Sequence, residues 1–164
     1  MRRMNPVLLS FASRLLDSED AESSPTSQSD EVEATEKAFR KLRGRLDRLL
    51  GQEGFDSLLR RALYLTASEY PFLENVTVEV SRISPNESRH LSTSRLKGLR
   101  DGTQGHDHAK VRAGLDALLG SFVWLLSTFI GEDLAFRQLR RIWPEILLVN
   151  VGDREGSDPE EARP

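Results

Sequence analysis

The sequence predicts an all-α fold, a small helical bundle with a disordered N-terminal linker and, at most, a short two-stranded element. Two observations predict this fold. Apolar residues recur at helical spacing in several stretches, whereas only 75–83 and 146–151 have a strand-like pattern. The 164 residues suit one domain. The sequence contains no cysteine, which excludes disulfides, thiolate zinc sites and cysteine nucleophiles.

The net charge of −3 is distributed unevenly along the chain. Residues 1–36 hold three basic and eight acidic residues, and residues 152–164 hold two basic and five acidic residues. The middle of the chain holds eighteen basic and thirteen acidic residues, a balance of about +5. The acidic flanks could shield a basic core from anions. The plainer interpretation is that they are solubilising segments, and residues 152–164 are predicted to be a disordered acidic tail.

Residues 1–16 are predicted to form a short amphipathic helix, because NPVLLSFASRLL is apolar at helical spacing and Pro6 suits a first helical position. Residues 17–34 hold no basic and no aromatic residue, so they predict an acidic disordered linker. A helix tethered in this way could dock into an apolar groove of a partner. The side chains expected to dock are Leu8, Leu9, Phe11 and Leu15.

Residues 35–151 are the predicted helical domain. The stretch TEKAFRKLRGRLDRLL, 35–50, carries one apolar stripe and one basic face, and Gly51 should end this helix. A second helix over 55–70 is stopped by Pro71. Two helices joined by a short loop predict an antiparallel hairpin.

The two strand-like stretches, 75–83 and 146–151, could pair with each other, although a lone pair of strands is marginally stable. Residues 84–107 are rich in Ser, Gly and Asn, which predicts a loop with one turn of helix within 92–100. Segment 82–100 holds several cations among serines and threonines, so it could be an anion-binding or phosphorylated loop. A surface loop without that role is the plainer interpretation.

The stretch SFVWLLSTFIGEDL, 121–134, begins with ten uncharged residues, which a glycine and two acids follow. From 117 to 131 no residue is charged, but fifteen helical residues span only about 22 Å, less than a hydrocarbon core of about 30 Å. We therefore predict a core helix, capped by Asp107, that other helices surround. A second helix should run from Glu132 to Pro144. The predicted core residues are Leu118, Leu119, Phe122, Val123, Leu125, Leu126, Phe129 and Ile130.

A strip of small residues on the core helix would let another helix approach closely, from the same chain or from a second copy. This strip comprises Ala113, Ala117, Gly120 and Ser121.

Two stretches, TFIGEDLAFRQLRRIWP (128–144) and EGFDSLLRRALYLTASEYPFL (53–73), resemble a group of small uncharacterised bacterial helical proteins. The resemblance covers about half of the chain. It implies a bacterial origin and a helical fold. The group has no established activity, so the resemblance assigns no functional residue.

Two polar clusters could carry chemistry, and both have plainer interpretations. His106, Asp107 and His108 are metal-ligand types, but their spacing does not put two ligands on one helical face as HExxH does. Glu132 and Asp133 could act as paired carboxylates, yet acids are also typical of a helix's first turn. We therefore predict no catalytic residue, no metal and no cofactor, and a protein that is not an enzyme.

The basic face of the 35–50 helix and one tryptophan are the remaining candidates. Arg40, Arg45 and Arg48 could contact phosphates, although a solvated face explains them equally well. Trp143 could anchor an interface or close the domain's own core. The sequence therefore predicts a cytoplasmic, non-enzymatic protein–protein interaction or regulatory module, acting on a protein partner or by self-association. The alternative is a nucleic-acid-binding protein, and integral membrane insertion is not expected.

Overall fold

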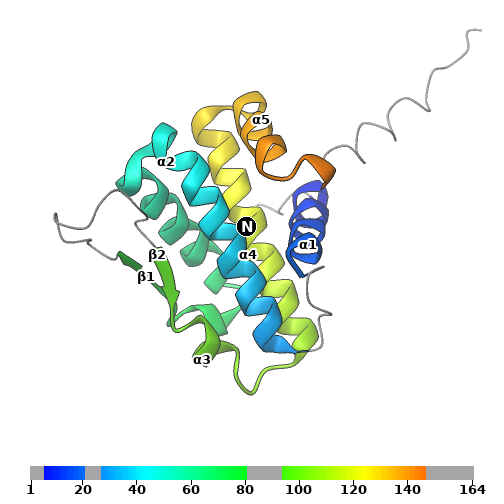
Figure 1. The fold of residues 1–164 in the computed structure, drawn as a ribbon. Helices are drawn as coiled ribbons and strands as arrows, with labels where there is room; N and C mark the ends of the chain where they lie inside the picture. Colours follow the sequence, from blue (N-terminus) through cyan, green and yellow to red (C-terminus); the bar gives the residue numbers. More distant parts are fainter. Residues whose placement is uncertain (1–5, 21–26, 81–93, 147–164) are drawn as a thin grey trace, which may run out of the picture.

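The computed structural model describes residues 6–20, 27–80 and 94–146. Over these residues the chain is a small helical bundle with one short two-stranded sheet, which confirms the predicted fold class (Figure 1). The elements in chain order are α1 (Pro6–Asp20), α2 (Gln28–Ala67), η1 (Pro71–Leu73), β1 (Thr77–Val80), β2 (Ser94–Lys97), α3 (Leu99–Thr103), α4 (His108–Ile130) and α5 (Glu132–Ile142).

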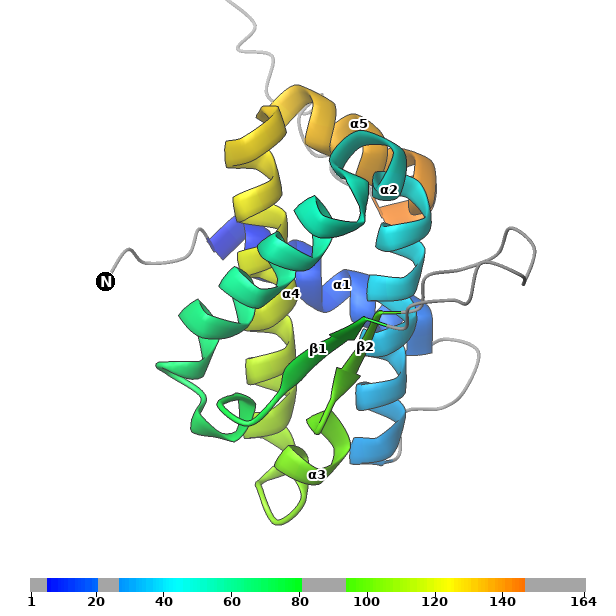
Figure 2. The same cartoon turned by 90° about the vertical axis from the view of Figure 1, so that its left-hand side faces the viewer.

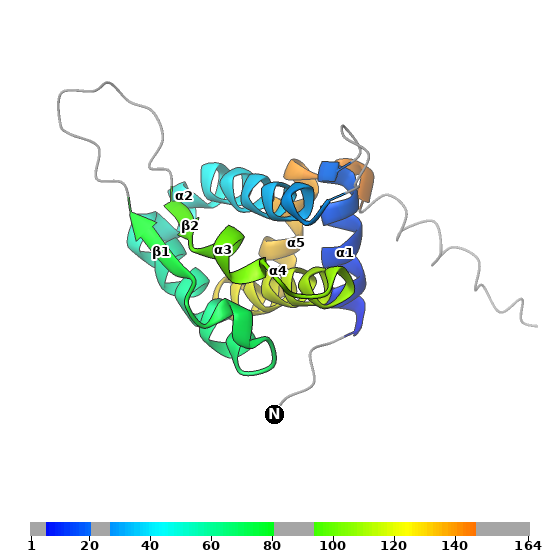
Figure 3. The ribbon, with the colours of Figure 1, turned by 90° about the horizontal axis from the view of Figure 1, so that it is seen from below.

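α4 is the central helix, with α1 on one side of it and the sheet on the other (Figures 1 and 3). Within the described residues it is the one helix long and apolar enough to cross a membrane, but 61% of its most apolar window is buried by the rest of the chain. Leu118 and Phe122 have no exposed surface. α4 is therefore a core helix here, as predicted. Phe129 is an exception to the predicted core, because it lies in the last helical turn and is 68% exposed.

α2 consists of two helical halves that turn back on each other at Gly51 (Figure 2). Gly51 has a φ of 69°, in the region that favours glycine, so the predicted break is confirmed. A buried ion pair between Arg43 and Asp56 joins the two halves. The guanidinium of Arg43 also lies 4.8 Å from the centre of the Phe55 ring. These contacts hold the angle between the two halves.

The predicted linker over 17–34 is corrected at both ends. Residues 17–20 belong to α1, and residues 28–34 form the first turns of α2. Val32 and Ala34 are buried, so the buried face of the predicted 35–50 helix extends into this segment. Composition hid this helix, because the many acids of the segment lie between a few well-spaced apolar residues.

The sheet differs from the predicted strand pair. β1 pairs antiparallel with β2, with Val78 opposite Leu96. The predicted partner 146–151 does not supply this strand: Ile146 is buried in the core, and residues 147–151 lie outside the described part of the chain. The helical turn expected within 92–100 is also displaced, because 94–97 is a strand and α3 begins at Leu99. An antiparallel partner that follows closely in the sequence needs only a short connection.

Close packing between η1 and α4 fixes the start of the sheet. Phe72 lies against Gly114, where an added Cβ would be only 2.4 Å from the Phe72 ring. The second half of α2 approaches α4 at Ser121, whose Oγ is 3.3 Å from that of Thr66. The partner of the small-residue strip is thus a helix of the same chain at this point. Ala113, also predicted for the strip, is exposed.

Candidate functional site: an open groove beside a strand edge

The N-terminal residues expected to dock into a partner pack on the chain itself. Phe11 and Leu15 are buried where α1 contacts α2 and α4. Leu8 and Leu9 lie in α1, but their side chains are outside the described part of the structure. The apolar face of α1 packs against α2 and α4 of the same chain, so Phe11 and Leu15 are not available to a partner in this fold.

A buried carboxylate fixes the C-terminal end of α1. Glu19 accepts hydrogen bonds from Lys41 of α2 and, at 2.8 Å, from the indole Nε1 of Trp143. Lys37 adds an ion pair at 3.4 Å. Burial raises the pKa of the Glu19 carboxyl. The hydrogen bonds from Lys41 and Trp143 and the charges of the two lysines together lower it by more than burial raises it, so the pKa lies below its ordinary value. Trp143 is therefore part of the chain's own core.

A second polar cluster holds the middle of α1 on α4. Arg112 donates to the Ser13 carbonyl oxygen at 2.9 Å and to Asp17 at 2.6 Å. It also pairs with Asp116 at 3.2 Å. Burial is the main reason why the pKa of Asp116 is raised, and Arg112 offsets only part of that effect. Charged contacts at two levels thus determine where α1 sits along the bundle.

Much of the predicted basic face of α2 is used inside the chain. Arg43 is buried against Asp56, and Lys37 and Lys41 pair with Glu19. Arg45 donates to Gln138 of α5 at 3.3 Å. Only Arg40 and Arg48 of this face are exposed without a hydrogen bond or ion pair to another described residue.

The other polar candidates lie at helix starts. Asp107 precedes α4, and His108 lies 2.8 Å from Glu31. His106 packs its ring 5.5 Å from that of Phe72. Across 6–20, 27–80 and 94–146, no three His, Cys, Asp or Glu side chains gather as a metal site would require. Glu132 and Asp133 are exposed in the first turn of α5, where acids favour the helix dipole.

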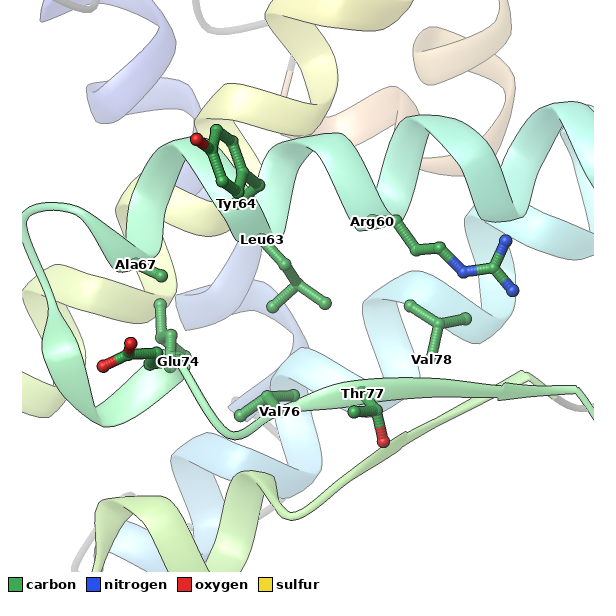
Figure 4. A pocket seen from close by; sticks show the side chains of 9 residues that line it. Arg60, Leu63, Tyr64, Ala67, Glu74, Val76, Thr77 and Val78 are labelled. Atoms are coloured by element: carbon green, nitrogen blue, oxygen red, sulfur yellow. The ribbon is translucent and has the colours of Figure 1, made fainter.

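The structure reveals a groove of about 310 Å³ that none of these predictions included. It lies between the second half of α2 and β1, and we call it the β1 groove (Figure 4). Its walls are mainly apolar, while a cation, Arg60, and an acid, Glu74, lie toward opposite ends of it. The apolar residues that line it are Leu63, Ala67, Leu73, Val76 and Val78.

The helical wall of the β1 groove presents a regular stripe. Arg60, Tyr64 and Ala67 follow the i, i+4, i+7 spacing of one helical face. Tyr64 is 79% exposed, and Arg60 has no ion-pair partner among the described residues. A large exposed aromatic beside a free cation is typical of interface residues.

The strand wall of the β1 groove has an unpaired edge. The described sheet has two strands only, so the edge of β1 away from β2 has no neighbouring strand there. The side chains of Val76 and Val78 point toward α2, while Thr77 points the opposite way (Figure 4). Unpaired backbone groups at such an edge can accept another extended chain. A hydrogen-bonding edge and an apolar groove therefore occur together.

Sequence reasoning missed this groove although part of its signal was visible. The pattern over 75–83 predicts a strand, and the apolar spacing over 55–70 predicts a helix. Nothing in the local sequence around Tyr64, however, indicates that its side chain stays exposed. Only the tertiary placement of β1 over α2 brings the two surfaces together.

No protein-family model, no curated protein and no solved structure matches this chain. The resemblance to small bacterial helical proteins therefore stays an expectation.

Proposed function

We propose that this chain is a non-enzymatic protein–protein interaction module, and that the β1 groove is the surface that receives its partner. The observation that carries the proposal is the coincidence of an apolar groove with an unpaired strand edge. The side chains of Val76 and Val78 offer apolar contact, and the β1 edge offers backbone hydrogen bonds. Recognition by added strands uses this combination.

The chemistry of the groove favours binding over catalysis. Its lining holds no histidine, serine or cysteine, and its two ionisable ends lie on different elements rather than in contact. Tyr64 and Arg60 are residue types that dominate binding energy at protein interfaces. A partner would bury the Tyr64 ring, which the chain alone leaves exposed. As part of this proposal, the module is bacterial and acts in the cytoplasm.

Nucleic-acid binding through the α2 face has less support. That proposal needs several cations free to contact phosphates. Lys37, Lys41 and Arg43 are engaged with acids of the same chain. Arg40, Arg45 and Arg48 remain without an acid partner among the described residues, and three such cations would give only a weak contact with a modest salt dependence.

A site-specific cross-link tests the proposed function. A photo-reactive amino acid replaces Tyr64 in the full chain expressed in its host, and a matched chain carries it at Glu132, which is exposed and far along the chain from the β1 groove. We expect a defined protein, either another chain or a second copy, to be cross-linked from position 64 and not from position 132.

Acid substitutions at neighbouring positions supply the second arm of this test. Ala67→Glu places a charge in the groove, whereas Ser68→Glu places it at an exposed residue that does not line the groove. The cross-link from position 64 should disappear with Ala67→Glu and persist with Ser68→Glu. Equal cross-linking from both reporter positions, or no cross-linked protein at all, would overturn the proposed function.

A further inference from the structure

We propose that the β1 groove receives the C-terminal segment 147–155 of a second copy of this chain, added as a third strand along β1. The inference rests on the proposed function, and it names the partner of that same site. The segment reads LLVNVGDRE and lies outside the described residues.

The segment has the two-residue alternation that the groove requires. In an extended chain, Leu147, Val149 and Val151 share one face with Asp153. This face is apolar for three positions and then acidic. The β1 groove is mainly apolar, and toward one end it has Arg60, a cation with no ion-pair partner among the described residues. Segment and groove are therefore complementary in both polarity and charge.

The spacing of the two patterns agrees. Tyr64 and Arg60 are four helical residues apart, which is about 6 Å along the helix axis. Val151 and Asp153 are two strand residues apart, which is about 7 Å. A strand that places Val151 beside Tyr64 thus brings Asp153 level with Arg60.

The charges also fix the direction of the added strand. Arg60 lies beside Val78, and Glu74 lies toward the start of β1 (Figure 4). A segment parallel to β1 brings Asp153 to the Arg60 end. An antiparallel segment would bring the same acid toward Glu74, where two like charges repel. We therefore assign the parallel direction.

The segment of the same molecule cannot occupy the groove. The chain leaves α5 beside α1, where Trp143 contacts Glu19. α2 and α4 lie between that position and the sheet (Figures 1 and 3). Residues 147–151 reach at most about 17 Å when fully extended, and each helix is about 10 Å wide. A strand lying wholly along β1 must therefore come from another copy.

Sedimentation of the full chain over a wide range of protein concentration tests the inference. We expect concentration-dependent association that Val149→Asp weakens about a hundredfold and Arg60→Glu about tenfold, because they place a charge in the apolar face and remove the pairing cation. The matched controls, Ala162→Asp in the tail and Arg61→Glu outside the groove lining, should leave association unchanged.

A charge exchange gives the sharpest arm of the test. Combining Arg60→Glu with Asp153→Lys should restore most of the association that Arg60→Glu alone removes. A chain that stays monomeric at every concentration would overturn the inference. Association that is as strong in Val149→Asp and Arg60→Glu as in the wild type would also overturn the inference. If the Tyr64 cross-link then captures a different protein, the proposed function stands and only this choice of partner fails.

Discussion

Two sides of α2 present apolar surface to another segment, and only one of them is filled. On the first side, α1 covers α2 and α4 with Phe11 and Leu15, and Glu19 is held by Lys41 and Trp143. On the second side, the β1 groove has apolar walls and a cation, Arg60, but no described segment covers it. We call the first surface, where Phe11 and Leu15 pack on α2 and α4, the α1 site.

The difference between the two surfaces shows what a segment that packs on α2 contributes. At the α1 site, the occupant supplies apolar side chains for the surface between helices and a carboxylate for the cations at its edge. At the β1 groove, neither the apolar contact nor the carboxylate is supplied, because Tyr64 stays exposed and Arg60 lacks an acid among the described residues. Substitutions at the two places should therefore have opposite profiles: stability at the first, binding at the second.

The largest effect is expected where the two halves of α2 are joined, because a buried ion pair links them. Asp56→Ala leaves the guanidinium of Arg43 buried without its carboxylate. Removing one partner of a buried ion pair costs about 3–5 kcal/mol. Urea unfolding followed by circular dichroism measures this loss. Replacing both residues, as Arg43→Met with Asp56→Leu, should recover most of it. If Asp56→Ala unfolds at the wild-type urea concentration, the pair does not hold the angle.

Truncation at the α1 site should cost nearly as much. Leu15 is fully buried, so Leu15→Ala should lower the free energy of unfolding by about 2–5 kcal/mol. Ser10→Ala, at an exposed position of the same helix, should change it by less than about 0.5 kcal/mol. Equal, small effects in the same urea series would mean that α1 is only loosely associated with the bundle.

A smaller effect with a defined pH dependence is expected at Glu19. Its pKa in the folded state lies below the ordinary value of 4.5, so its contribution to stability is present above that value and is lost as pH falls through the folded-state pKa. Glu19→Gln should cost about 1–3 kcal/mol at neutral pH and should flatten the acidic limb of the stability profile. Thermal unfolding at a series of pH values measures both.

Asp116 provides the opposite control. Its pKa is raised by burial, so its ionised form opposes folding at neutral pH, and this cost disappears as pH falls through the folded-state pKa. Asp116→Asn should therefore remove a stability gain that appears on mild acidification, while leaving the loss at lower pH in place. Identical profiles for Glu19→Gln and Asp116→Asn would contradict these assignments.

The smallest effect on stability is expected at the β1 groove. Tyr64→Ala removes a ring that is 79% exposed, so the free energy of unfolding should change by less than about 0.5 kcal/mol. Binding of the partner should nevertheless weaken about tenfold or more, as is usual for a central interface tyrosine. Unfolding curves and binding isotherms of the same variant separate the two quantities. A large loss of stability with unchanged binding would make Tyr64 a structural residue.

The parts of the fold that depend on local sequence could be predicted. Gly51 ends a helix by its own conformational preference, and the uncharged run of α4 predicts a core helix from composition alone. The partner of β1 and the position of α1 depend on contacts between distant residues, such as Trp143 with Glu19. No short window of sequence contains such contacts. The β1 groove was missed for the same reason, because its two walls meet only in the folded chain.

Residue-resolved amide hydrogen exchange of the full chain at low and high protein concentration tests the contrast between the two surfaces most directly. We expect protection of Thr77–Val80 to rise with concentration, because a second copy covers the β1 edge. Protection of α1 should stay constant, because its site is filled within one molecule. Unchanged protection of β1 together with concentration-dependent protection of α1 would contradict this expectation, since α1 would then be the segment that contacts a second copy.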